Sequence, residues 1–321
     1  MNNVPVTEVQ QHKHLGLTIS HNLRWSSHID YVLAKAYKRI NIMRKFKFIL
    51  DRSSLETIYL SFIRPILEYG DILFDNCTQQ ESESLEQVQQ EAARITTGAT
   101  KLVSVQKLMS DLGWDSLKVR RNKHKLVLFY KMINNLTPPY LSSIVPSQVN
   151  ASSRYHFRND GDYQLVYART SLYYNSFLPS VVRDFNSLPA NIRSANTIVT
   201  FKKLLFANKH SVPSFFNHGT RKQQVLHARL RTNCSSLAND LYTKNILDSP
   251  NCSCGQVETT THYFLRCPRF DAQRTRMLEA IANICPVSLK LLLFGDPKLN
   301  DDSNSSIFSA VHTYIIQTGR F

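Results

Sequence analysis

Apolar residues recur at helical spacing along the first half of the chain. In the first such stretch they are separated by three, four or seven positions, and they are Ile29, Leu33, Ala36, Ile40, Met43 and Leu50. Basic residues fill much of the remainder, namely Lys35, Lys38, Arg39, Arg44, Lys45 and Lys47. This pattern predicts an amphipathic helix with a cationic outer face.

Two more helices are predicted before residue 100. Ser53 and Glu56 have the spacing of a capping box, so a second helix is predicted to begin at Ser53. Pro65 is predicted to kink or end it. A third helix is predicted to end near Gly98, because glycine suits a left-handed C-cap. Its apolar side comprises Leu85, Val88, Ala92 and Ile95.

A further helix is predicted over Leu117–Leu136, stopped by the prolines that follow Thr137. Its predicted inner set is Leu126, Phe129, Tyr130 and Ile133. Its predicted outer set is basic and comprises Lys118, Arg120, Arg121, Lys123, Lys125 and Lys131. Like the first helix, it is therefore expected to present positive charge to the solvent.

Shorter elements and loops separate these helices. Alternation over His14–Ile19 predicts a short strand, and Tyr163–Ala168 is typical of a strand or extended arm. The stretch 142–162 is rich in Ser and Asn and is predicted to be a linker. A short basic helix is expected over Phe201–Lys209, and the polar run Asn300–Ser306 is predicted to be a surface loop. The fold class is thus mainly α.

The charge balance indicates polyanionic partners. Lys and Arg number 39 against 24 Asp and Glu, which gives a formal net charge of +15. Such a surface attracts RNA or DNA. The stretch from Asp71 to Glu91 contains acids but no Lys or Arg, so cationic binding is excluded there. Because neither a membrane span nor a secretory signal is apparent, we expect an intracellular chain, nuclear or cytoplasmic.

Three of the six cysteines lie within sixteen residues, in the order Cys252-x-Cys254-x7-His262-x4-Cys267. Three thiolates and one imidazole suit tetrahedral Zn²⁺. Four protein ligands leave no position for an activated water, so the predicted role of the zinc is structural. The single residue between the first two cysteines is tighter than the usual spacing, and Gly255 is expected to relieve that turn. Tyr263 is predicted either to pack beneath the metal or to stack on a base.

Several strings, in order and spacing, resemble the region downstream of the catalytic core in jockey-like non-LTR retrotransposon reverse transcriptases. His14–Ile29 resembles the hairpin that leads from the polymerase palm into the thumb. Strings resembling the thumb are Ile58-Tyr59, Pro65, Leu67–Gly70, Leu112–Trp114, Leu117, Arg120-Arg121, Tyr130-Lys131 and Pro139–Leu141. Strings resembling the connection that follows the thumb are Phe185–Pro189, Ile192-Arg193 and Phe201-Lys202. Cys252–Cys267 resembles the terminal zinc knuckle of the family.

The resemblance implies an organisation in five parts. These are a hairpin with a helical thumb-like bundle (1–141), a linker (142–162), a mixed connection region (163–233), a small zinc-knuckle module (234–299) and a C-terminal tail (300–321). In the family, a thumb grips the duplex of template and primer. The residues then expected to contact nucleic acid, whether template and primer or the element's own RNA, are Lys35, Lys38, Arg39, Arg44, Lys45, Lys118, Arg120, Arg121, Lys125 and Tyr263.

The catalytic carboxylates of the family have no counterpart here. Its palm carries an aromatic-x-Asp-Asp turn that holds two divalent ions. Tyr69-Gly-Asp71 lacks the second Asp, and Asp301-Asp302 lies in the predicted polar loop. We therefore expect a nucleic-acid-binding fragment without catalytic residues, inactive as a polymerase on its own. The alternative is a helical scaffold whose zinc site mediates contact with another protein.

Overall fold

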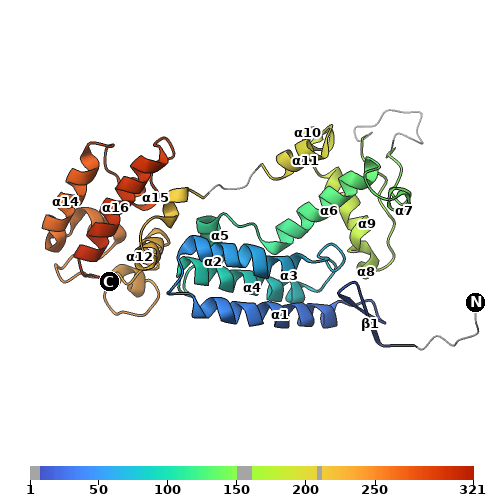
Figure 1. The fold of residues 1–321 in the computed structure, drawn as a ribbon, viewed down its shortest axis with the longest axis horizontal. Coiled ribbons are helices and arrows are strands. Elements are labelled where there is room, and N and C mark those ends of the chain that lie inside the picture. Colours follow the sequence, from blue (N-terminus) through green and yellow to red (C-terminus); the bar gives the residue numbers. More distant parts are fainter. Residues whose placement is uncertain (1–7, 150–160, 208–211) are drawn as a thin grey trace, which may run out of the picture. The chain divides into compact units, whose positions relative to one another are not determined.

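The computed structural model describes residues 8–149, 161–207 and 212–321, and it confirms a mainly helical chain with a short antiparallel β-hairpin near the N-terminus (Figure 1). Part of the predicted linker, 150–160, and the end of the predicted basic helix, 208–209, lie outside the described residues. None of the helices in the described part is long and apolar enough to cross a membrane.

The chain forms two compact units that interleave in sequence. Unit 1 comprises the described residues of Met1–Tyr37, Arg64–Val88 and Asp115–Lys209. Unit 2 comprises Lys38–Ile63, Gln89–Trp114 and the described residues of His210–Phe321. Three of the five divisions fall inside helices α1 (Ser26–Lys45) and α4 (Gln79–Thr97) and at the junction between a π-helical turn and helix α3. The other two fall after Trp114 and after Lys209.

The remaining elements of unit 1 are β1 (Gln11–His14), β2 (Leu17–Ser20), α3 (Arg64–Glu68), α6 (Leu117–Ile133), α7 (Pro139–Ser142), α8 (Ser171–Tyr174), α9 (Phe177–Asn186), α10 (Ala190–Arg193) and α11 (Ile198–Leu205). Those of unit 2 are α2 (Arg52–Ile58), the π-helical η1 (Tyr59–Ile63), α5 (Val105–Leu112), η3 (Ser214–Asn217), α12 (Arg221–Arg231), α13 (Ala238–Tyr242), η4 (His262–Arg266), η5 (Pro268–Phe270), α14 (Asp271–Ala282), α15 (Leu289–Phe294) and α16 (Asp301–Gln317).

The N-terminal strand prediction is corrected to a hairpin. β1 and β2 pair in antiparallel register from Gln11 opposite Ser20 to His14 opposite Leu17. The turn residues Leu15 and Gly16 have φ values of 46° and 84°, which two-residue hairpin turns require. The chain therefore reverses inside the predicted strand His14–Ile19, and the hairpin implied by the resemblance is present.

The start of α2 also differs from the prediction. The N-cap is Asp51, whose Oδ1 accepts a hydrogen bond from the Ser54 amide at 2.8 Å. Glu56 does not close a capping box, because its carboxylate accepts from the Trp114 indole at 2.9 Å. Pro65 does not end the helical run. Proline has no amide proton to donate within a helix. The wide turn η1, which ends two residues before Pro65, accommodates this, and the chain continues as α3.

The core of unit 1 forms where α6 packs against α9 and α11. Tyr130 stacks on Phe201 with ring centroids 4.3 Å apart, and Phe129 meets Phe185 edge to face at 5.2 Å. The buried residues of this core are Leu126, Phe129, Tyr130, Val181, Val182, Phe185 and Phe201. The predicted inner side of α6 is thus confirmed for its first three residues, while Ile133 is only partly buried.

The predicted outer side of α6 is wrong at two positions. Arg121 and Lys125 are buried, and both pair with Asp75, at 3.2 and 2.6 Å. Lys125 also lies 3.4 Å from the Asp184 carboxylate. The acidic stretch Asp71–Glu91, which the sequence analysis excluded as a cationic surface, therefore supplies a counterion to the buried cations of α6.

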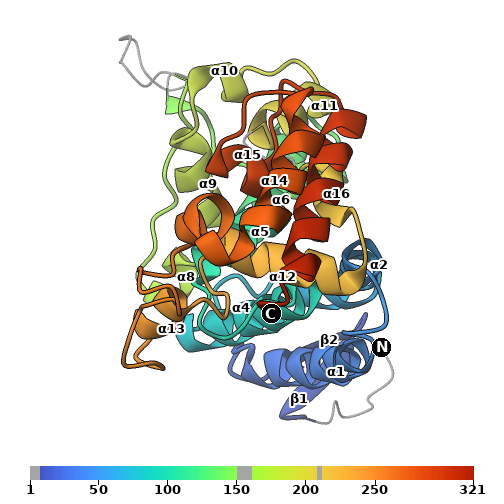
Figure 2. The same ribbon diagram turned by 90° about the vertical axis from the view of Figure 1, so that its left-hand side faces the viewer.

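The core of unit 2 forms around α16, which packs against α14, α12 and α15 (Figures 1 and 2). Its buried residues recur at helical spacing and include Ile307, Phe308, Val311, Tyr314 and Ile315. The predicted loop Asn300–Ser306 is therefore wrong, since it forms the start of this helix. Asn300 is the N-cap and accepts from the Ser303 amide at 2.8 Å. Asp301 and Asp302 occupy the first turn, where negative charge is favourable.

Candidate metal centre

Cys252 and Cys254 lie on a tight turn of unit 2. The Cys252 amide donates to the Gln256 carbonyl at 2.7 Å, and the Gly255 amide donates to the Cys252 carbonyl at 2.8 Å. Gly255 has a φ of 87°, a conformation that costs little only for glycine. The glycine thus allows two ligands to project from positions separated by one residue.

His262 and Cys267 lie at the two ends of the wide turn η4. The Cys267 amide donates to the His262 carbonyl at 2.8 Å, which is the i to i+5 bond of a π-helix. A spacing of five residues therefore brings these two side chains to the same side of the turn. Such single π turns often occur at functional sites.

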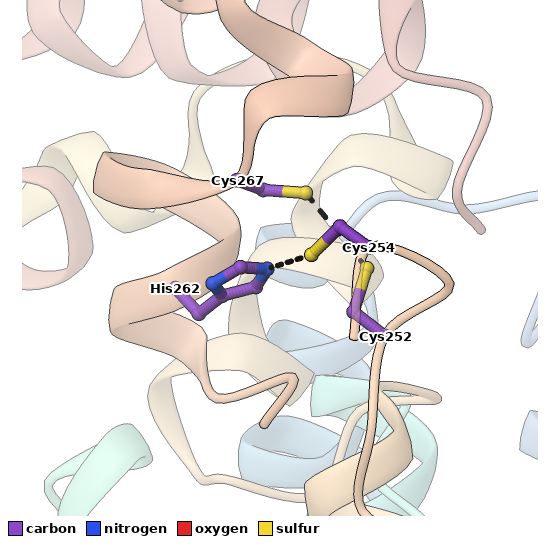
Figure 3. Close-up of side chains that lie close together, drawn as sticks. All are labelled: Cys252, Cys254, His262 and Cys267. Atoms are coloured by element: carbon purple, nitrogen blue, oxygen red, sulfur yellow. Dashed lines mark hydrogen bonds between the residues drawn. The ribbon is translucent and has the colours of Figure 1, made fainter. Parts of the chain in front are cut away.

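The four side chains converge on one point, as Figure 3 shows. Their ligand atoms all lie within 4.8 Å of one another, with 3.8 Å between Cys252 Sγ and Cys267 Sγ and 3.3 Å between Cys254 Sγ and His262 Nε2. Tetrahedral zinc with bonds of about 2.3 Å to sulfur and 2.0 Å to nitrogen places sulfurs about 3.8 Å apart and sulfur and nitrogen about 3.5 Å apart. The donor set and its spacing therefore fit a zinc ion.

The surroundings of the cluster suit a closed structural site. Cys252, His262 and Cys267 are buried, and Cys254 is partly buried. Burial raises the pKa of the Cys252 thiol, but hydrogen bonds from the Cys254 amide, His262 and Arg269 outweigh it and bring the pKa to about 6. Burial, followed by its cysteine neighbours, raises the pKa of Cys267 to about 11. One ligand is thus readily ionised, whereas another needs the metal to displace its proton.

The segment between His262 and Cys267 belongs to the core of unit 2. Tyr263 and Phe264 are completely buried and pack against Tyr314 of α16, with ring centroids 5.2 and 5.6 Å apart. The Tyr263 hydroxyl lies 2.8 Å from Thr318 Oγ1. Of the two predicted roles of Tyr263, packing is therefore observed. Its ring offers no face for a base, which corrects its place among the nucleic-acid contacts.

An ion pair with a buried carboxylate holds the turn that carries the first two cysteines. The Glu258 carboxylate is buried, and it accepts from Arg320 Nε and Nη2 at 2.7 and 2.6 Å. It also accepts from the Ala238 amide at 2.6 Å. Three strong hydrogen bonds to the Glu258 carboxylate thus fix the segment that follows this turn.

The cationic residues predicted on α1 are mostly accessible. Lys35, Lys38, Arg44 and Lys45 are exposed. Arg39 is partly buried and donates to the Phe62 carbonyl. Arg44 pairs with Glu91 at 3.0 Å. The structure thus leaves the three lysines of this set at the surface.

The cationic residues predicted on α6 are mostly engaged within unit 1. Lys118 is exposed, whereas Arg120 is partly buried and paired with Glu68. Arg121 and Lys125 are the buried partners of Asp75 described above. This helix therefore offers less free positive charge than its sequence indicates.

One accessible cluster was missed by the sequence analysis. Lys13 of β1 and Lys35 of α1 place their Nζ atoms 5.0 and 6.0 Å from the ring centroid of Tyr31. Tyr31 is 44% exposed. The i to i+4 spacing of Tyr31 and Lys35 signals half of this arrangement. Lys13 is brought in only by the pairing of β1 with β2 beside the helix.

No protein-family model matches this chain, and the search of curated proteins finds no match either.

Proposed function

We propose that this chain binds nucleic acid as a C-terminal part of a reverse transcriptase of the jockey-like non-LTR kind, and that it does not polymerise on its own. The observation that carries the proposal is the surface cluster of Lys13, Tyr31 and Lys35, which we call the hairpin cluster. It combines positive charge with a tyrosine side chain that is partly accessible, on a chain with a net charge of +15.

The chemistry of the hairpin cluster suits a nucleic-acid strand. Lysines at a surface neutralise phosphates and release counterions, which gives affinity without sequence preference. An exposed tyrosine ring can stack on any base. Lys38, Lys45 and Lys118 are further exposed cations that can contact phosphates.

The near matches to a polymerase motif have other roles. Asp71 is buried, and its carboxylate lies 2.7 Å from His124 Nδ1. Asp301 accepts from the Ser214 hydroxyl at 2.5 Å and lies in the first turn of α16. Among the described residues, neither belongs to a cluster of side chains that could hold a metal ion.

The zinc ion is proposed to hold the fold of unit 2. The four protein side chains would complete a tetrahedral shell, and three of them are buried. The metal would thus connect the turn at Cys252 and Cys254 to the core segment at His262 and Cys267. It would support the nucleic-acid-binding chain without contacting the strand itself.

The test is a fluorescence-anisotropy titration of labelled RNA and DNA hairpins with the zinc-loaded chain at about 50 and 200 mM salt. The wild type is compared with the double variant Lys13→Ala/Lys35→Ala and with Tyr31→Ala. A matched control is Lys244→Ala/Lys290→Ala, which removes two exposed lysines of unit 2.

We expect binding that weakens steeply with salt, and a logarithmic salt slope that falls by about 2 in the double lysine variant because two phosphate contacts are lost. Tyr31→Ala should weaken binding about tenfold with an unchanged slope. Absence of binding at low salt, or an equal loss in the control, would contradict the proposal. The scaffold alternative would then be favoured.

A further inference from the structure

Unit 2 contains a buried ion triad with one charge in excess. The Asp111 carboxylate pairs with Arg52 Nη1 at 2.6 Å and with Arg231 Nε at 3.0 Å. The side chains of Arg52, Asp111 and Arg231 are only 2%, 6% and 2% exposed. Two guanidinium groups thus share one carboxylate, which leaves a net charge of +1 in the interior.

The hydrogen-bonding capacity of the triad is also incompletely used. Among the described residues, the buried atoms Arg231 Nη2 and Arg52 Nε have no hydrogen-bond partner. Burial lowers the pKa of Arg231, although the Asp111 carboxylate opposes this shift. A buried cation without full compensation is unfavourable, so a further anion beside it would be stabilised.

A cavity lies against this triad. It has a volume of about 610 Å³ and is lined by Asp111 and Arg231 together with Lys107, Phe216, Thr232 and Phe294. Lys107 is exposed, and its Nζ donates to the Thr232 carbonyl at 3.1 Å. No described carboxylate forms an ion pair with it. Lys107 therefore adds a second uncompensated positive charge to the cavity.

The walls of the cavity include aromatic surface. Phe216 packs under the Arg231 guanidinium, whose carbon lies 4.0 Å from the ring centroid. Phe294, the last residue of α15, is 44% exposed. Gly295 follows it with a φ of 68°, and a Cβ there would lie 2.6 Å from both Asn304 and Phe215. This close packing at Gly295 holds the backbone next to Phe294 in place, and so holds Phe294 at the wall of the cavity.

We propose that this cavity binds a phosphate monoester that also carries a flat aromatic base, with nucleoside monophosphates as the representative class. The phosphate dianion would match the excess charge of the triad and that of Lys107. The flat group would lie against Phe294. A volume of about 610 Å³ is in the usual range for small-molecule sites.

This inference does not rest on the proposed function. The cavity lies in unit 2, whereas the hairpin cluster lies in unit 1. A free nucleotide and the 5′ end of a strand present the same chemical group, so the experiment includes a probe for each. Failure of one proposal leaves the other intact.

The experiment is isothermal titration calorimetry of the zinc-loaded full chain with AMP, adenosine and inorganic phosphate at about 50 mM salt. The test variant is Lys107→Glu, and the matched control is Lys101→Glu, an exposed lysine that does not line the cavity. Both variants should fold, because both positions are exposed. Lys107 also lies in the first turn of α5, where an acid is favourable. Melting curves of both variants check this.

AMP is expected to bind, with adenosine at least about 30-fold weaker, since it lacks the group that the cations recognise. Lys107→Glu should weaken AMP binding at least about tenfold, and Lys101→Glu less than about threefold. The proposal is overturned if neither AMP nor phosphate binds, if adenosine binds as tightly as AMP, or if the two variants lose equal affinity.

A tetranucleotide with and without a 5′ phosphate distinguishes the two sources. A preference for the phosphorylated strand that disappears in Lys107→Glu assigns the cavity to strand ends as well. Binding of AMP without that preference assigns it to free nucleotides.

Discussion

Removal of zinc should destabilise unit 2 without unfolding unit 1. The perturbation is either a chelator or the substitution Cys254→Ser, which removes one ligand. Cys254 is the partly buried member of the four, so its replacement disturbs packing less than a change at Cys267, which is completely buried. The expected effect is therefore the loss of metal binding itself.

The magnitude follows from mass action. Zinc at about 1,000 times its dissociation constant stabilises a folded state by about 4 kcal/mol. Isolated zinc fingers depend on their metal entirely, but unit 2 also has an extensive apolar core around α16. We therefore expect destabilisation instead of complete unfolding. For a unit of this size, about 4 kcal/mol corresponds to a melting temperature lower by about 8–16 °C.

The assay is differential scanning calorimetry of the zinc-loaded and chelated wild type, of Cys254→Ser, and of Cys285→Ser as control. Cys285 is also partly buried but lies outside the cluster. The chelator should lower the transition of the wild type and of Cys285→Ser, with little further effect on Cys254→Ser. A wild-type transition that is unchanged by chelation would refute the reasoning.

Two other predictions concern the packing of unit 2. Gly98→Ala should destabilise the chain by about 2–3 kcal/mol in chemical denaturation, because Gly98 has a φ of 72° and a Cβ there would lie 2.4 Å from Val225. The control is Gly161→Ala, which should be nearly neutral because nothing lies within 4 Å of a Cβ at that position. Burial lowers the pKa of His312 from 6.5 to about 4. The unfolded chain therefore takes up this proton first, and stability should fall by up to about 3 kcal/mol as the pH decreases from 6.5 to 4. Denaturation of His312→Gln over the same range should show a smaller fall, and an identical fall would count against this assignment.

The features that the sequence predicts correctly are those encoded locally. The four residues of the cluster that could hold a metal ion lie within sixteen residues, so their spacing carries most of the geometry of the site. The apolar side of α4, ending at Gly98, and most of the apolar side of α6 are also visible as periodic patterns. Such patterns are imposed by the helix itself and need no knowledge of distant residues.

The features that the sequence analysis misses depend on distant partners. Arg121 and Lys125 have the spacing of an outer basic face, but both are buried and form ion pairs with Asp75. Asp111 meets Arg231 across 120 residues of sequence. Pairing of this kind is decided by tertiary packing, which no helical period encodes.

The start of α16 illustrates a different failure. Asn300, Asp301 and Asp302 have the composition of a loop, yet the same residues are favourable at a helix N-terminus. Only the apolar residues from Ile307 onward distinguish the two interpretations. A prediction that treats the polar run and the apolar run as one segment would have found this helix.

The most direct test of the metal centre is X-ray absorption spectroscopy at the zinc edge, on protein prepared without added metal-binding tags. One zinc per chain is predicted, coordinated by three sulfur atoms at about 2.3 Å and one nitrogen at about 2.0 Å. A metal-free protein, or zinc bound mainly by oxygen, would contradict the account.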